Sequence, residues 1–365
     1  MLARAFLAGL SLVLAACWAH AQTLAPSDQP PHLLPGESTP EVTPDNSGQR
    51  AWQVQPVAIA ERPARIFASG SLAPLGSVRI VGESGAWYGL VDCEKGLCAK
   101  LISAPHAEER LPAGALPGSH IAQATGRISR AWLADPVQRI QGSAIGPLVA
   151  GALVVQDNIG KQFRLELGLD QAFEDLRPRI ADIEGGGEQT LFVVRSSRQG
   201  AALIAVRLEG EGLLRIVGET PQVGRQNGWI NPVGIADFTA TGRKSIAIVT
   251  SPDQRGELEI LNFVDRGFRK QLSVPGVSTH LPGTAIVDMA VIGDFEANNG
   301  ADIAVPDTSR RTIRILSFGH GQIAEPADIK LPASVTTDVA GIQGRKGARP
   351  MLLMGLADGE LVLLH

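Results

Sequence analysis

The chain has 365 residues and a formal net charge of −4 at pH 7, and it contains 41 glycines and 24 prolines. This length allows one large all-β domain or two smaller domains, and the Gly and Pro content favours β structure rich in turns. The charge and the lack of any Lys/Arg run argue against a nucleic-acid partner, because phosphates are neutralised by clustered basic residues. An aromatic fraction of 4% weakens sugar binding without excluding it.

Residues 1–21 have the features of a secretory signal: Arg4, an apolar run over 6–16 and small residues at the end. We therefore expect an exported protein, periplasmic or secreted. Two cleavage sites remain open, because AHA before Gln22 would release the chain, whereas LAAC resembles a lipobox and would anchor it through a lipid on Cys17. The apolar run is too short to span a bilayer, which needs about 20 residues, so we expect membrane attachment only through Cys17.

Two segments precede the main body of the chain. Residues 22–60 are rich in Pro, Ser and Thr and are expected to form a disordered tether. Residues 61–112 alternate apolar and polar side chains in short pieces separated by glycines, which predicts a small β unit. This unit resembles the small Src-homology-like barrels of exported bacterial proteins, in which Trp87 and Tyr88 would line a groove suited to cell-wall attachment. Alternatively, it is an extra blade of the following domain, and both side chains are core.

The cysteines fit an oxidising compartment. Removal or lipidation of Cys17 leaves Cys93 and Cys98, which are five residues apart in VDCEKGLCAKL. We predict a disulfide between them. A redox or metal pair is the alternative, but it would need C-x-x-C spacing or further Cys/His ligands nearby.

One pattern occurs three times: ADIEGGGEQTLFVV, ADFTATGRKSIAIV and GDFEANNGADIAV. In each copy a small residue precedes Asp182, Asp237 or Asp294, a large apolar residue follows, and a Gly stands five or six positions later. An apolar run then begins nine residues after the Asp. This order predicts a polar loop with a tight turn that leads into a buried strand. The aspartates are 55 and 57 residues apart, and two further strands follow each copy, as in propeller blades.

The stretch that includes AWLADP, WINPVGIADF and VIGDFEANNGADIAVPD resembles exported bacterial FG-GAP/VCBS repeat-containing proteins. The resemblance runs from Ile121 to the C-terminus and implies an all-β fold, with a degenerate β-propeller over 113–365. We count four or five recognisable blades, and up to seven if 65–103 contributes. In such propellers an N-terminal strand often completes the last blade, which would suit a chain that ends in ELVLLH.

In that family the loop commonly reads D-x-D-x-D-G-x-x-D and binds Ca²⁺ through oxygen atoms, the ligands that this cation prefers. The third copy keeps oxygen-bearing residues at the first, third, fifth and ninth positions. The resemblance therefore implies a tentative calcium site, and no other cofactor is expected. Its four candidate ligands are Asp294, Glu296, Asn298 and Asp302.

The other two copies have lost two or three carboxylates, so we expect their loops to be empty. A structural interpretation covers all of the loops, and we favour it overall. In this interpretation Asp182, Asp237 and Asp294 accept hydrogen bonds from backbone N–H groups and hold the turn, as in Asx caps.

Enzymatic signatures such as G-x-S-x-G, H-E-x-x-H and the phosphate loop are missing from the sequence. We therefore predict a non-catalytic binding or scaffolding module of the bacterial envelope, whose partner is an unknown envelope protein or polysaccharide. The alternative is a propeller hydrolase or lyase that acts on cell-envelope polysaccharide. Acidic or His side chains that converge at the channel mouth would favour the enzyme, whereas an apolar or hydrogen-bonded channel would favour binding.

Overall fold

A computed structural model describes residues 51–68, 70–94, 96–104, 111–224, 228–252, 254–344 and 348–365. The expected signal, Cys17 and most of the expected tether lie outside this part. The described residues form 25 strands and two short 3-10 helices, η1 (Leu75–Ser77) and η2 (Gly319–Gly321). No helix among them is long and apolar enough to cross a membrane. The fold is all-β, as predicted.

The described strands divide into antiparallel units in which each strand pairs with the next along the chain. The first unit contains β2 (Pro63–Phe67), β3 (Arg79–Gly82), β4 (Trp87–Cys93) and β5 (Gly96–Ile102). The second contains β6 (Ala122–Gln123), β7 (Ile128–Val137), β8 (Val149–Asp157) and β9 (Gln162–Glu166). The third contains β11 (Arg179–Ala181), β12 (Thr190–Ser197), β13 (Gly200–Glu209) and β14 (Leu213–Glu219).

Three further units complete the series. The fourth contains β15 (Ile230–Ala236), β16 (Ser245–Thr250), β17 (Glu257–Val264) and β18 (Gly267–Pro275). The fifth contains β19 (Val291–Gly293), β20 (Asp302–Pro306), β21 (Thr312–Ser317) and β22 (Ala324–Lys330). The sixth contains β23 (Ala340–Ile342), β24 (Met351–Gly355) and β25 (Leu361–Leu364), with β1 (Val54–Val57) as its fourth strand.

The first strands of successive units contact one another: β6 with β11, β11 with β15, β15 with β19 and β19 with β23. Sheets that meet along their first strands in this way are the blades of a β-propeller, with the first strand innermost. The second and third blades are joined into one nine-stranded sheet, because β10 (Gln171–Phe173) pairs with both β8 and β12. The six units lie within the predicted range of up to seven blades.

The strands that follow the three Asp motifs are buried, as the repeat predicted. All six residues of β16 are buried, as are all five of β20. Such continuous apolar runs form because a blade packs against neighbouring blades on both of its faces. One mixed core, for example, contains Val249 of the fourth blade and Val305 of the fifth.

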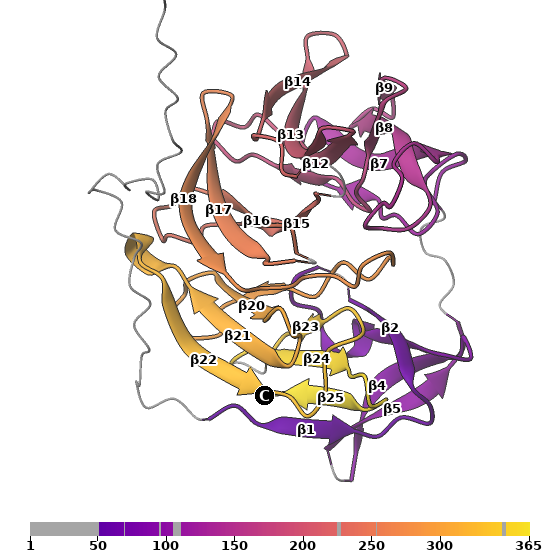
Figure 1. Ribbon diagram of the computed structural model, residues 1–365, viewed down its shortest axis with the longest axis vertical. Helices are drawn as coiled ribbons and strands as arrows, with labels where there is room; N and C mark the ends of the chain where they lie inside the picture. The colour runs from indigo at the N-terminus through magenta and orange to yellow at the C-terminus, as the bar shows by residue number, and fades with distance from the viewer. Residues whose placement is uncertain are drawn as a thin grey trace, which may run out of the picture. The chain divides into compact units, whose positions relative to one another are not determined.

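The last blade is completed by the N-terminal strand. β1 pairs antiparallel with β25, and Val54 lies opposite Leu364 and Val57 opposite Leu361 (Figure 1). This pairing confirms the expected closure. β1 nevertheless lies within 22–60, the stretch expected to be a tether. It is ordered here because β25 is buried along its length, and an unpaired apolar edge would leave its backbone groups without partners.

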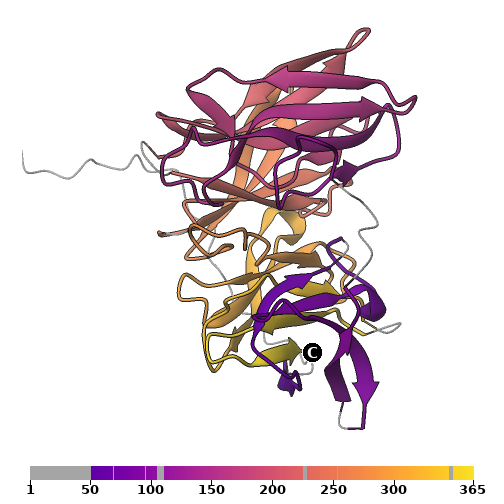
Figure 2. The same cartoon turned by 90° about the vertical axis from the view of Figure 1, so that its right-hand side faces the viewer.

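The small β unit is a blade, which decides between the two alternatives that the sequence left open. Its strands share one hydrophobic core with the C-terminal strands, and Ile80 and Leu90 pack in the same cluster as Leu353. In Figure 2 the indigo strands accordingly lie beside the yellow ones. Tyr88 is buried in this core, and Trp87 stacks on Phe67 with ring centroids 5.8 Å apart.

The predicted disulfide is present. Cys93 and Cys98 are joined across the β4–β5 hairpin, with their Cα atoms 6.0 Å apart. The same hairpin contacts the closing segment of the chain, because the Ala99 N–H donates to the Ala58 carbonyl at 2.8 Å. The disulfide thus lies beside the strand that completes the last blade.

Candidate functional site

The three Asp loops share one hydrogen-bond pattern. In every copy both carboxylate oxygens accept backbone N–H groups from three to five residues downstream. The bonds are Asp182 to Gly185 and Gly187, Asp237 to Thr241 and Gly242, and Asp294 to Asn298 and Asn299, at 2.7 to 3.1 Å. The prediction that these aspartates hold the turn is therefore confirmed.

The residue five positions after each Asp adopts a left-handed conformation. Gly187 has φ 83° and Gly242 has φ 76°, and in the third copy the position is filled by Asn299 with φ 63°. The turn residue of that copy is thus Asn299, which takes the place of the glycine, and not the Gly300 that follows it. Asn tolerates this conformation better than other side chains, so the loop keeps its shape without a glycine.

The ninth position of each loop points inward and bonds to the residue opposite it on the next strand. Asp302 has 0% exposure, and its carboxylate accepts the Ser317 hydroxyl at 2.6 Å and the N–H groups of Phe295 and Glu296 at 2.8 and 3.1 Å. Burial raises the pKa of Asp302, and these hydrogen bonds oppose the shift. The equivalent bonds in the other copies are Arg207 to Thr190 at 2.9 Å and Ser245 to Asn262 at 2.6 Å.

The four predicted calcium ligands are therefore differently placed. Asp294 and Asn298 lie in the exposed turn, where Asn298 also accepts the Gly300 N–H at 2.7 Å. Asp302 lies beneath the loop and bonds to its backbone, and Glu296 contributes its N–H to that contact. Within the described ranges, no three His, Cys, Asp or Glu side chains are grouped so as to hold a metal. Calcium binding at this loop remains a prediction.

In the first loop, a guanidinium group lies where two acidic side chains meet. Arg207 of β13 is buried and pairs with Glu184 and with Glu188, the latter at 2.8 Å. Its guanidinium carbon also lies 5.6 Å from the centre of the Phe263 ring, within the range of a cation–π contact. Arg207 thus offsets part of the negative charge of this loop.

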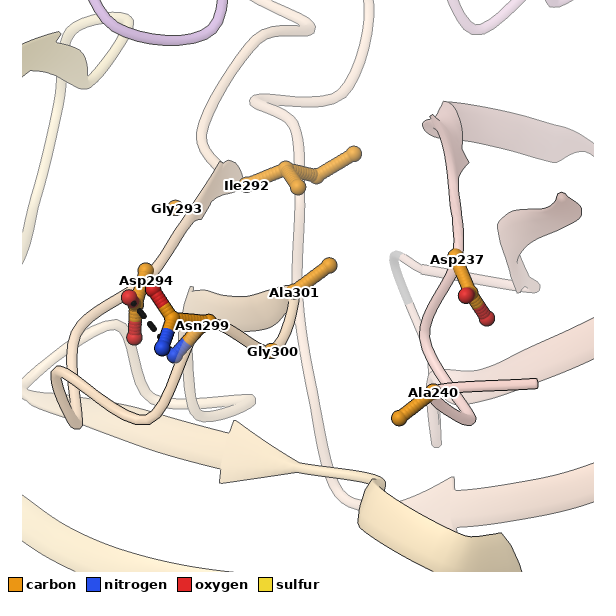
Figure 3. A pocket seen from close by; sticks show the side chains of 8 residues that line it. All are labelled: Asp237, Ala240, Ile292, Gly293, Asp294, Asn299, Gly300 and Ala301. Atoms are coloured by element: carbon orange, nitrogen blue, oxygen red, sulfur yellow. Dashed lines mark hydrogen bonds between the residues drawn. The ribbon is translucent and has the colours of Figure 1, made fainter. Parts of the chain in front are cut away.

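A pocket of about 490 Å³ separates the second and third loops (Figure 3). Asp294, bonded to Asn299, borders one side and Asp237 borders the other. Both carboxylates already accept two backbone N–H groups of their own loops, so they have little capacity left for a ligand. The pocket is a surface feature of the turns.

A different group of residues gathers at the other ends of the first strands, where the chain enters each blade. We call it the axial cluster. It comes from within β2, from just before β6, from the start of β11, and from just before β19 and β23. Its members are Arg65, His120, Asp175, Arg177, Arg179, Asp288 and Asp338.

Two ion pairs of the axial cluster are closed. The Arg179 guanidinium binds both oxygens of the buried Asp175 at 2.6 to 2.7 Å and also donates to the Pro232 carbonyl at 2.9 Å. The Arg65 guanidinium donates to Asp338 at 2.6 Å, and the other oxygen of Asp338 accepts the Asp288 N–H at 3.3 Å. These bonds connect the first, third, fourth, fifth and last blades.

The third pair, Arg177 and Asp288, is not joined by a hydrogen bond, and we call it the open pair. The guanidinium of Arg177 lies 3.6 Å from the carboxylate of Asp288, and their side chains are 37% and 44% exposed. This separation is too long for a good hydrogen bond. Burial raises the pKa of Asp288, but the positive charge of Arg177, with contributions from His120 and the other two arginines, outweighs it and lowers the net pKa. Asp288 is therefore an ionised, accessible acceptor.

His120 lies beside this pair. Its backbone N–H donates to the Leu176 carbonyl at 2.7 Å, which fixes the segment before β6 against the third blade. Burial lowers the pKa of His120, and the carboxylate of Asp288 opposes the shift. The imidazole is thus mainly neutral at pH 7.

The sequence interpretation singled out none of these seven residues. They come from five separate segments of the chain, and only the packing of the blades brings them together. One signal was available, since Asn231 and Asp288 each stand six residues before a motif aspartate. Asn231 is buried and donates to the Val287 carbonyl at 2.7 Å, so this position supports the segment that carries Asp288.

No protein-family model matches the chain, and no curated protein matches it. Similar solved structures include BBS1N in complex with ARL6, at 14% identity and a TM-score of 0.42, covering 86% of this chain and 96% of that one. The WD40 domain of Toxoplasma gondii coronin has 10% identity and a TM-score of 0.46, with 86% and 85% coverage. The exotype rhamnogalacturonan lyase YesX has 10% identity and a TM-score of 0.37, with 82% and 57% coverage.

Proposed function

We propose that this chain is an exported, non-catalytic binding module of the bacterial envelope, built on a degenerate propeller of the FG-GAP/VCBS type. The observation that carries the proposal is the open Arg177–Asp288 pair within an otherwise closed cluster. Its donors and acceptor are accessible, and they are held by contacts among several blades. A preorganised polar group of this kind binds a ligand with little loss of conformational entropy.

The closed pairs support binding over catalysis. Asp175 and Arg179 are almost fully buried and bind each other, so they brace the cluster and do not reach a ligand. The hydrogen bonds that close two of its three ion pairs meet the condition under which we expected a binding module, whereas the Asp and His side chains that converge there meet the condition under which we expected an enzyme.

The disulfide and the expected signal support an envelope location. A Cys93–Cys98 bond persists in oxidising compartments and is rare in the cytosol. An N-terminal signal over 1–21 would deliver the chain there, and lipid on Cys17 would hold it at a membrane. Its partner would then be an envelope protein or polysaccharide.

The proposal is tested by capture on the immobilised full-length protein. We compare the wild type with the double variant Arg177→Met/Asp288→Asn, using solubilised envelope polysaccharide and protein fractions from the native cell. The matched control is Arg269→Met/Asp265→Asn, an exposed ion pair of similar length, 3.7 Å, in the β17–β18 hairpin. We expect the wild type and the control to retain a component that the axial variant loses. Equal retention by all three would refute the axial site.

A second function has one observation in its favour. Burial raises the pKa of Asp338 to about 6, whereas the pKa of its neighbour Asp288 is lowered. Two carboxyls displaced in opposite directions are typical of a general acid and base, as a hydrolase or lyase acting on cell-envelope polysaccharide would need. This alternative predicts release of new chain ends from envelope polysaccharide, abolished by Asp338→Asn. If the wild-type protein releases no new chain ends, the hydrolase or lyase alternative is wrong.

A further inference from the structure

The charges of the axial cluster balance. Three arginines face three aspartates, and the neutral His120 adds nothing to the sum. A ligand with a net charge therefore gains no long-range attraction from the cluster as a whole. This balance favours a neutral group at the open pair.

The open pair also limits the kind of neutral group. Arg177 offers N–H donors only, and the carboxylate of Asp288 offers acceptors only. A ligand carboxylate would suit Arg177 but would be repelled by Asp288, while an ammonium group would suit Asp288 but would meet three arginines. A hydroxyl donates and accepts at once, so two neighbouring hydroxyls can bond to both members of the pair.

Trp229 does not offer a stacking platform to the axial cluster. Trp229, the tryptophan on the segment that enters β15, is 3% exposed, and its Nε1 donates to the Glu174 carbonyl at 2.9 Å. Its ring packs against His280 at 4.7 Å. Recognition by the open pair would rest on directed hydrogen bonds from Arg177 and to Asp288.

We infer that the Arg177–Asp288 pair binds vicinal hydroxyls of a neutral sugar. This inference rests on the proposed function and gives the axial site its ligand class. The guanidinium donates to the hydroxyl oxygens, and Asp288 accepts the hydroxyl protons. The closed Arg65–Asp338 pair, through its bond to the Asp288 backbone, holds the acceptor in place.

The test uses the full-length protein and four sets of defined probes in calorimetric or saturation-transfer titrations. The probes are neutral hexose methyl glycosides, the matching uronic acids, the matching amino sugars, and short neutral peptides. We expect the neutral glycosides to bind at least about tenfold more tightly than either charged set. The uronic acids would be repelled by Asp288, and the amino sugars would be repelled by the arginines. Preference for a charged probe or a peptide, or no binding of neutral glycosides, overturns the inference.

The variants connect binding to the open pair. Asp288→Ala is expected to weaken glycoside binding by about tenfold or more, as loss of a charged hydrogen-bond acceptor does. The exposed Asp265→Ala should leave binding unchanged, and thermal unfolding checks that both variants are folded. Unchanged glycoside affinity in Asp288→Ala would overturn the inference.

The experiments distinguish an error in the inferred sugar ligand from an error in the proposed binding site. If the wild type binds no neutral glycoside, yet its envelope capture still depends on Arg177 and Asp288, the sugar inference is wrong and the binding function stands. If envelope capture does not depend on these two residues, the axial site itself is wrong.

Discussion

The two ends of the first strands are built on opposite principles. At the end where β11, β15 and β19 lead into the Asp loops, each carboxylate bonds to N–H groups within five residues of it. At the other end, the Arg65–Asp338 bond joins different blades and spans 273 residues, although Asp175 and Arg179 pair within one segment. The first end is a repeated turn, whereas the second is a single site assembled once per molecule.

The difference shows where a degenerate repeat can acquire function. The turns repeat because in each loop the Asp carboxylate accepts the backbone N–H groups that would otherwise lack partners. The axial residues differ from blade to blade, since each contributes one distinct group to a shared space. Substitutions at the two ends should therefore have different consequences.

The largest effect is expected within the axial cluster. Arg179→Met leaves Asp175 buried and without its guanidinium partner, which should lower the free energy of unfolding by about 3 to 5 kcal/mol. Arg177→Met removes the open pair and should cost less than about 0.5 kcal/mol. Urea denaturation measures both. If both variants lost the same free energy of unfolding, the distinction between the closed Arg179 pair and the open Arg177 pair would be wrong.

The next effect concerns pH. The Asp338 pKa is about 6 in the folded protein, above the ordinary 3.8. A raised pKa means that the folded state binds the proton more tightly, so stability from this group is fully present below pH 4 and is lost as the pH rises through about 6. The shift corresponds to about 3 kcal/mol. Asp338→Asn should flatten the stability profile between pH 4 and 7, and an unchanged slope would disprove the assignment.

In the third loop, the buried carboxylate of Asp302 should contribute more to the free energy of unfolding than the exposed carboxylate of Asp294. Asp302→Ala removes the acceptor of three hydrogen bonds and should cost about 2 kcal/mol. Asp294→Ala removes a turn-capping carboxylate at the surface and should cost about 1 kcal/mol. Thermal or urea unfolding compares the two variants. A larger loss for Asp294 would mean that the exposed turn, and not its buried support, stabilises the loop.

The smallest effect is expected for calcium. Asp302 is directed inward and Asp294 already accepts two N–H groups, so any binding at this loop should be weak, with a dissociation constant of about a millimolar. Calorimetric titration of the metal-stripped protein measures it. The heat should disappear in Asp294→Asn and persist in Asp237→Asn. No heat at millimolar Ca²⁺ in the wild type would remove the calcium prediction.

Much of the fold could be predicted. The motif spacing indicated the blades, the alternation over 61–112 indicated strands, and the separation of Cys93 from Cys98 indicated the disulfide. The turn role of Asp182, Asp237 and Asp294 was also predicted. The inward direction of Asp302 was not, because its partner Ser317 lies on the next strand and only the β20–β21 register places it opposite.

The sequence by itself determined the features that depend on short-range interactions: the turns, the buried runs after them and the hairpin disulfide. These follow from spacing, because their partners lie within a few residues. The tertiary structure alone decided that the 61–112 unit is a blade, that the strand which completes the last blade is β1, and that Arg177 meets Asp288. These contacts depend on which strands become neighbours, and burial of the blade faces sets that order over the whole chain.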